Sequence, residues 1–144
     1  MKTIATWRTF DLFHDGHREF LQKAKALGDR LVVVVVPDTV VYKNKRRYPL
    51  HNQETRAENV RRFSCVDEVY IDSFGEGLSS LLSSKPDLFV FGKGQDQKWR
   101  KKLKEYLRSR GIEPTYQFIR TASKTHTTTL RESLEKSPPE TNSK

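Results

Sequence analysis

The sequence predicts an α/β fold: a Rossmann-like, doubly wound parallel sheet of about five strands with helices on both faces. Three observations support this prediction. Short apolar runs alternate along the chain with segments whose apolar residues recur at helical spacing. The run at 31–36 has no polar interruption, as expected for a strand that is buried on both faces of a parallel sheet. The length of 144 residues suits one domain with a substantial core.

The first quarter of the chain is expected to form a strand–helix–strand unit. Residues 3–8 form the first predicted strand, and a helix follows from His17 to Gly28, where a glycine suits a helix end. The apolar residues of this helix recur at helical spacing: Phe20, Leu21, Ala24 and Leu27. The strand at 31–36 completes a βαβ unit, which should be right-handed.

The remaining elements continue the alternation. The polar segment from Asp38 to Pro49 is expected to be a loop, and Asn52 can cap the helix after it. Further strands are expected at 66–71, 88–91 and 115–119. A short helix should stop before Pro86, and a basic helix with Trp99 on its apolar face should end at Gly111.

A last helix is expected at 127–136. Residues 1–136 then form one domain, and the tail 137–144 has too little apolar surface to be ordered. Because the carboxyl ends of parallel strands meet at one edge of a sheet, the strand ends near Thr9, Asp38, Gly92 and Arg120 should border a ligand crevice.

The composition narrows the kind of ligand and the compartment. The formal net charge of +9 suits polyanionic ligands. A single cysteine excludes an internal disulfide and fits a reducing compartment, so we expect a cytoplasmic protein. The first residues lack the pattern of a secretion signal, and no apolar run reaches the roughly 20 residues of a membrane span.

Two histidines, His14 and His17, stand where the first strand passes into the first helix. The amides of a helix start attract phosphate, and both imidazoles can donate N–H groups to phosphate oxygens and carry positive charge when protonated. The alternative is a helix cap with a packed histidine. A zinc site is disfavoured, because Cys65, His51 and His126 form no ligand-spaced cluster with this pair, and we expect no metal held by the protein alone.

The string around these histidines resembles the first signature of the HxGH nucleotidyltransferases. It runs Arg8-Thr9-Phe10-Asp11-Leu12-Phe13-His14-Asp15-Gly16-His17. The resemblance is to the small cytidylyltransferase-like group, with Gly-Thr-Phe-Asp-x-x-His-x-Gly-His. That group includes glycerol-3-phosphate cytidylyltransferases, archaeal-type FAD synthetases and a heptose-phosphate adenylyltransferase domain. Arg8 stands where this group has a glycine that lets phosphates approach the backbone, so the arginine either supplies charge to the site or blocks it.

Three further segments match the family pattern, and the resemblance implies a role for each. Lys43 and Lys45 lie in a basic loop that looks like a lid over the triphosphate, unless it is simply a solvated loop. Arg56, in a string similar to the family's Glu-x-Arg, either braces the lid or contacts phosphate, unless it is an exposed helix residue. Asp96 follows Gly94, where relatives carry an acidic residue.

A fourth segment, from Arg120 to Leu130, looks like the family's second signature, Arg-Thr-x-Gly-Ile-Ser-Thr-Thr. It is longer by about one residue and lacks the glycine. An arginine at a strand end can clamp phosphates, and Thr121 follows it in the same string. A helix start that is rich in threonine, with Thr127 and Thr128, offers hydroxyls and amides to an anion. The alternative is an ordinary helix cap, and the insertion leaves the pairing of Thr127 and Thr128 open by one residue.

Together these features predict a nucleotidyltransferase that moves a nucleoside monophosphate from an NTP to a small phosphorylated acceptor and releases pyrophosphate. We expect His14, His17, Lys45 and Arg120 to act in catalysis. The residues expected to bind the substrates are Thr9, Phe10, Gly16, Lys43, Arg56, Asp96, Thr121, Thr127 and Thr128. Mg²⁺ is expected to arrive on the nucleotide's phosphates. The sequence has no Gly-x-x-x-x-Gly-Lys-Ser/Thr string, which argues against a P-loop kinase.

The substrate pair stays open at this stage. CTP with glycerol 3-phosphate is the first choice, because the second signature is of that type, and ATP with FMN is the alternative. A third hypothesis is a catalytically inactive relative that binds nucleic acid through its basic helix, which Arg8 favours; we expect nucleic acid not to be the partner. The resemblance also implies a homodimer and no membrane partner.

Overall fold

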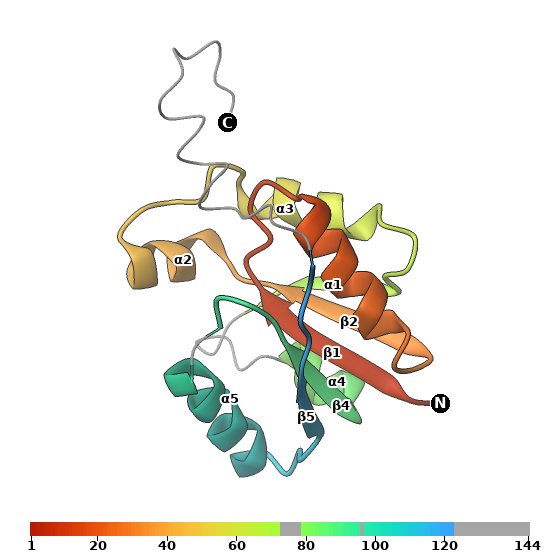
Figure 1. Ribbon diagram of the computed structural model, residues 1–144. Coiled ribbons are helices and arrows are strands. Elements are labelled where there is room, and N and C mark those ends of the chain that lie inside the picture. Colours follow the sequence, from red (N-terminus) through yellow and green to blue (C-terminus); the bar gives the residue numbers. More distant parts are fainter. Residues whose placement is uncertain (73–78, 96, 123–144) are drawn as a thin grey trace, which may run out of the picture.

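The computed structural model describes residues 1–72, 79–95 and 97–122, and these form a five-stranded parallel sheet between two layers of helices (Figure 1). The strands are β1 (Thr3–Arg8), β2 (Arg30–Val35), β3 (Glu68–Ile71), β4 (Leu88–Phe91) and β5 (Thr115–Phe118). Their order across the sheet is β3-β2-β1-β4-β5, and all four pairings are parallel. The order reverses between β1 and β4, which makes their carboxyl ends the switch point of a doubly wound sheet. The predicted fold class is confirmed.

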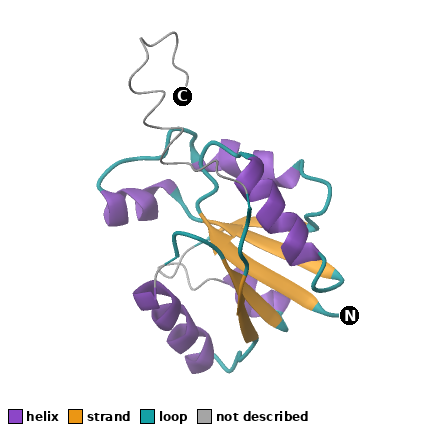
Figure 2. Cartoon of the chain, viewed as in Figure 1, coloured by secondary structure: helices purple, strands orange, loops and turns teal. Residues whose placement is uncertain are grey.

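The helices cover both faces of this sheet (Figure 2). They are α1 (Asp15–Lys25), α2 (Asp38–Lys45), α3 (Gln53–Arg61), α4 (Ser79–Ser84) and α5 (Gln97–Ser109). On one face, α1 and α3 bury apolar side chains against β1, β2 and β4, and on the other α4 and α5 do the same. Strand β2 shows the alternation: Val33 and Val35 belong to the first cluster, and Val34 belongs to the second.

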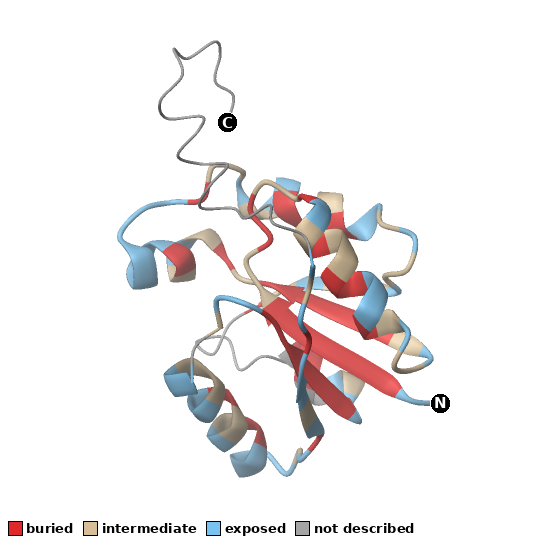
Figure 3. Cartoon of the chain, viewed as in Figure 1, coloured by how far each residue is buried: buried red, intermediate tan, exposed pale blue. Residues whose placement is uncertain are grey.

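The burial of the strands explains why the central ones are apolar throughout. Strands β1, β2 and β4 are buried almost along their whole length, whereas β5 at the sheet edge is largely exposed (Figure 3). A strand that is covered on both sides has no solvent face on which polar residues could alternate. Among the described residues, no helix combines the length and the apolar character that a bilayer crossing requires.

One predicted element is wrong. The segment from Asp38 was expected to be a loop up to Pro49, but its first eight residues form α2. Pro37 precedes the helix with its fixed φ, and Arg46 ends it in a left-handed conformation at φ 62°. Only Val41 of this helix is buried, so its sequence carries no amphipathic pattern. The predicted helix at 127–136 and the tail 137–144 lie outside the described residues.

Candidate active site

A cleft of about 920 Å³ opens at the carboxyl ends of β1 and β4, at the switch point. This volume lies in the upper part of the ~300–1,000 Å³ range of small-molecule pockets. Its walls come from the end of β1 and the turn into α1, from α2 with the loop after it, from the loop after β4, and from α5. The polar lining residues are Arg8, Thr9, Asp11, His14, His17, Asn44, Lys45, Arg47, Tyr48, Lys93, Gln95, Lys98, Lys102 and Thr121.

His14 and His17 are stacked side by side at the start of α1, and both line the cleft. Their ring centroids are 3.8 Å apart. Nδ1 of His14 accepts the N–H of Gly16 (3.1 Å), and Nδ1 of His17 accepts the N–H of His14 (3.3 Å). The two side chains therefore form a capping box, and helix cap and cleft wall are the same pair of residues.

This capping box also fixes the protonation of the rings. An Nδ1 that accepts a backbone N–H carries no proton, so each neutral ring bears its proton on Nε2 and offers a donor there. Burial, strengthened by nearby positive groups, lowers the pKa of His17 from 6.5 to about 2. The role of both rings as N–H donors to phosphate stays a prediction, and the lowered pKa of His17 means that its ring would donate in the uncharged form at neutral pH.

Aromatic rings hold His17 in place. Phe10 meets its ring edge-on at 5.2 Å, and Phe13 stacks on it at 5.7 Å between centroids. Phe10 is buried and has a positive φ of 57°, a conformation that costs a residue with a side chain about 1–2 kcal/mol. The turn is held by Asp11, whose carboxylate accepts the N–H groups of Leu50 and His51, both at 2.9 Å.

Arg56 does not line the cleft. Its side chain is fully buried, so the alternative that Arg56 is an exposed helix residue is wrong. It donates to the carbonyl of Thr9 (2.7 Å), the carbonyl of His51 (3.0 Å) and the carboxylate of Asp38 (2.6 Å). Arg56 thus ties the turn after β1 to the starts of α2 and α3 and is placed to brace these segments, away from any phosphate in the cleft.

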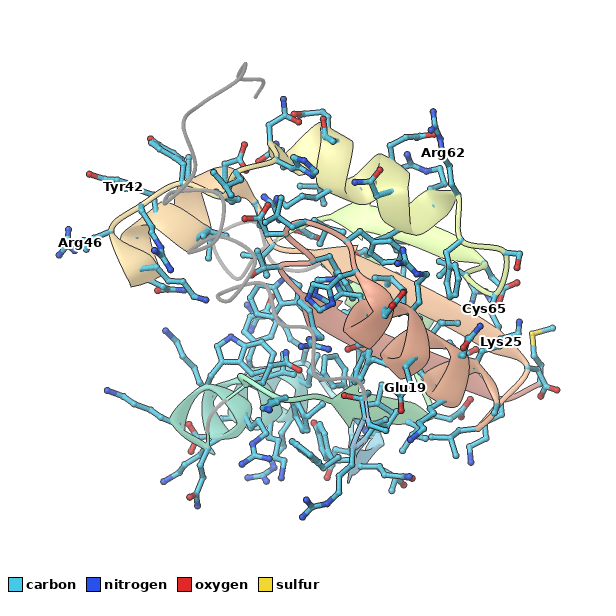
Figure 4. All side chains as sticks on the ribbon, turned by 45° about the horizontal axis from the view of Figure 1, so that its top comes forward. Glu19, Lys25, Tyr42, Arg46, Arg62 and Cys65 are labelled. Carbon is cyan, nitrogen blue, oxygen red and sulfur yellow. The ribbon has the colours of Figure 1, made fainter. Side chains whose placement is uncertain are left out.

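The predicted lysines separate. Lys45 lines the cleft, whereas Lys43, two residues earlier on α2, is exposed and does not. In Figure 4, Tyr42 and Arg46 mark the outer side of the same helix, where they project away from the sheet. Two residues turn a helix by more than half a circle, so the two lysines cannot share one face.

Arg120 is also not among the residues that line the cleft. Its backbone carbonyl accepts Nζ of Lys23 (2.9 Å), and the N–H of Ala122 donates to the carboxylate of Glu19, labelled on α1 in Figure 4 (2.7 Å). The chain after β5 is therefore anchored on α1. The side chain of Arg120 is exposed, and its role as a phosphate clamp stays a prediction. Thr121 does line the cleft, as do the predicted Thr9, Phe10 and Gly16. Asp96, Thr127 and Thr128 lie outside the described residues.

Several cleft residues were not predicted. Lys98 and Lys102 lie one turn apart on α5 and both line the cleft, a spacing that the sequence displays. Trp99, expected in the core, both lines the cleft and packs on Trp7 at 5.2 Å. Gln95 pins the loop after β4, since it donates to the carbonyl of Trp7 (2.6 Å) and accepts the N–H of Gly92 (2.9 Å).

Arg8 lies on the wall between α1 and the loop after β4. Its guanidinium stacks over the ring of Phe20 at 4.5 Å and donates to the carbonyl of Lys93 (2.9 Å). Gly92 makes room for it, because an added Cβ there would come within 2.7 Å of Nη1 of Arg8. Burial lowers the pKa of Arg8 to about 10, which leaves it charged at neutral pH.

No group of three potential metal ligands is present within the described segments. Asp11 is the cleft's carboxylate there, and it already accepts two backbone N–H groups. The donor set is thus rich in cations and N–H groups, which fits phosphates better than a bare metal ion. A divalent cation would fit this site together with the phosphates that carry it.

Comparisons with known proteins agree with the geometry. A family model described as cytidylyltransferase-like matches residues 6–133. A FAD synthase of Thermococcus onnurineus is 47% identical over 105 residues, which cover 72% of this chain and 69% of that protein. A FAD synthase of Methanothermobacter thermautotrophicus is 38% identical over 116 residues, covering 78% and 75%.

Solved structures share the fold. A lipopolysaccharide core biosynthesis protein from Thermoplasma volcanium superposes with a TM-score of 0.73 at 27% identity, covering 85% of this chain and 99% of that one. A pantoate-beta-alanine ligase from Francisella tularensis gives a TM-score of 0.60 at 16% identity, covering 90% and 65%, and supports the fold alone.

Proposed function

The chain belongs to the cytidylyltransferase-like family and is a nucleotidyltransferase, and we propose that it transfers AMP from ATP to FMN, forming FAD and pyrophosphate. The observation that carries this proposal is the set of FAD synthases that match at 38–47% identity. They favour the second of the two substrate pairs that the sequence left open, ATP with FMN, over CTP with glycerol 3-phosphate.

The proposed reaction needs positioning and charge stabilisation more than a base. An oxygen of the FMN phosphate attacks the α-phosphorus of ATP, and the bond from that phosphorus to the oxygen bridging to the β-phosphate breaks. The electron pair of that bond leaves with pyrophosphate. The attacking phosphate is already an anion, so no strong general base is required.

The residues of the cleft fit this reaction. The first turn of α1 and the Nε2–H groups of His14 and His17 would donate to phosphate oxygens, where charge builds up as the bond breaks. Lys45 and Lys102, on opposite walls, would gather the phosphates of the two substrates. Mg²⁺ would enter with ATP and neutralise part of its charge.

Two exposed tyrosines at the rim of the cleft suit a flat acceptor. Tyr42 and Tyr48 stack with their centroids 4.6 Å apart, and Tyr48 lines the cleft while 58% of its surface is exposed. Aromatic faces favour stacking with other rings, which the isoalloxazine of FMN provides and glycerol 3-phosphate does not. This feature supports FMN as the acceptor.

The test is a matrix of nucleotides and acceptors. The protein is incubated with Mg²⁺, with ATP or CTP, and with FMN or glycerol 3-phosphate, while pyrophosphate release and FAD formation are followed. FAD should form with ATP and FMN, and the other three combinations should release little pyrophosphate. Pyrophosphate release that requires CTP and glycerol 3-phosphate, with no FAD from ATP and FMN, would show the proposal to be wrong.

A further inference from the structure

Arg8 is a partly buried positive charge with no negative partner among the described residues. Its guanidinium meets the ring of Phe20 and one backbone carbonyl, that of Lys93, and none of the ion pairs within residues 1–72, 79–95 and 97–122 includes it. Arg56, the fully buried arginine at the same edge of the sheet, is paired with the carboxylate of Asp38. Partial withdrawal of a charge from water has a cost that an opposite charge offsets, and an anion in the cleft that Arg8 lines would provide that charge.

Arg8 adds a positive charge beside an imidazole, that of His17, which does not carry one. Burial above all keeps His17 neutral, and the positive charge of Arg8 contributes to this. The two groups share a neighbour, since the Phe10 ring lies 5.8 Å from the Arg8 guanidinium and 5.2 Å from the His17 ring. A neutral ring offers a dipole, whereas a triphosphate brings several negative charges. Arg8 is a permanent cation at the same end of the cleft.

We propose that Arg8 is a phosphate-binding residue that takes an oxygen of the nucleotide's phosphate chain together with the Nε2–H groups of His14 and His17. A guanidinium presents five N–H donors in a planar fork, and one of them is used on Lys93. The stacking on Phe20 holds the plane of the fork in place. Arg8 would thereby bind phosphate through its charge, whereas the glycine in similar strings helps phosphate binding by letting it approach the backbone.

The packing of the Arg8 side chain indicates that it does not block the cleft. The cleft measures about 920 Å³ with the arginine side chain present. Arg8 lies flat against the wall, between Phe20 and the loop at Gly92, where even one added Cβ would collide with it. Room for a nucleotide is left beside it.

The inference rests on the proposed function only in requiring a nucleotide, so the test measures binding and not FAD formation. ATP with Mg²⁺, adenosine and FMN are each titrated calorimetrically into the full chain and into three variants. Arg8→Met keeps an unbranched stem over Phe20 without the charge, and Arg8→Lys keeps the charge without the fork. Arg110→Ala, which removes an exposed arginine that does not line the cleft, is the control.

Arg8→Met should weaken ATP binding roughly ten- to a hundredfold, the range for losing hydrogen bonds to a charged group. Adenosine, which lacks the phosphates, should bind within about twofold of the wild type, and Arg8→Lys should lie between. Arg110→Ala should bind like the wild type. Equal or tighter ATP binding by Arg8→Met would overturn the proposal and identify Arg8 as an obstruction. A loss confined to FMN would overturn the assignment to the nucleotide.

Thermal unfolding of each variant without ligand shows whether Arg8→Met folds. If Arg8→Met does not fold, ATP binding by Arg8→Lys, which keeps the charge, decides the test. The outcomes separate the two proposals. ATP binding that depends on Arg8 without FAD formation would refute the proposed function and keep this inference. If Arg8→Met binds ATP and forms FAD as the wild type does, the proposed function is kept and the inference on Arg8 is refuted.

Discussion

Replacing Arg56 by methionine should destabilise the protein strongly, although Arg56 does not line the cleft. The side chain is fully buried and donates to two backbone carbonyls and to the carboxylate of Asp38. Removing one partner of a buried ion pair costs about 3–5 kcal/mol, and the lower end applies because Asp38 retains some exposure to water. An unfolding entropy of about 2.1 cal/mol/K per residue converts 3 kcal/mol into a drop in Tm of about 10 °C for a chain of this length.

The assay is urea and thermal unfolding followed by circular dichroism, with a matched control on the same helix. Arg61→Met removes an exposed arginine that pairs with Glu58, and it should cost less than about 0.5 kcal/mol. Arg56→Lys retains the charge but not the fork and should fall between the two. An Arg56→Met variant that unfolds within about 1 kcal/mol of the wild type would refute the assignment of Arg56 as the brace of this edge.

The remaining predictions concern the cleft. His17 is neutral when folded, whereas the unfolded chain takes up a proton below pH 6.5, so wild-type stability should fall by about 1.4 kcal/mol per pH unit from this group between pH 6.5 and 4.5. His17→Gln keeps the capping box without titrating, and equal pH dependence of unfolding in both proteins would contradict the assignment. His14→Ala removes a helix cap and a donor, so FAD formation should drop about a hundredfold or more with a loss of stability near 1 kcal/mol; unchanged turnover in a rate assay would exclude its role. Tyr48→Ala should raise the KM for FMN several-fold and leave that for ATP unchanged in steady-state kinetics, and an equal rise in both would argue against stacking of the flavin ring.

The sheet could be predicted because the sequences of its central strands are apolar throughout, which indicates burial. The uninterrupted apolar run from Leu31 is possible only where helices cover both faces, and the chain order of strands and helices then fixes a doubly wound topology. Helix α2 could not be predicted in this way, since Val41 is its one buried residue and packing leaves no periodic pattern in the sequence. Pro37 precedes the helix and Arg46 ends it in a left-handed conformation, and only the backbone structure shows that they bound a helix.

The location of the candidate site could be predicted, but the sequence did not show which arginines line the cleft and which pack elsewhere. Arg56 lies in a polar stretch that is typical of an exposed helix face, and its partner at the Thr9 carbonyl is 47 residues away. Arg120 does follow a strand, as predicted, but its carbonyl accepts from Lys23 and the N–H of Ala122 donates to Glu19, and its side chain is not among those that line the cleft. Such tertiary partners leave no trace in local spacing. The protonation of His17 likewise follows from which ring nitrogen accepts a backbone N–H, which residue identity does not specify.

The positive surplus of the chain bears on the choice between an enzyme and a nucleic-acid-binding module. Part of that surplus is gathered around the cleft, where the cationic lining residues are Arg8, Lys45, Arg47, Lys93, Lys98 and Lys102. The single carboxylate among the described lining residues, Asp11, is engaged by two backbone N–H groups. A concave site lined by one sign of charge concentrates small anions and speeds their capture, and this effect weakens as salt screens the field. A nucleic-acid module needs its charges in a track along the surface, whereas here Lys98 and Lys102 of the basic helix α5 line the same cleft as the imidazoles. The basic composition is therefore better explained by the capture of a nucleotide than by the binding of a polymer.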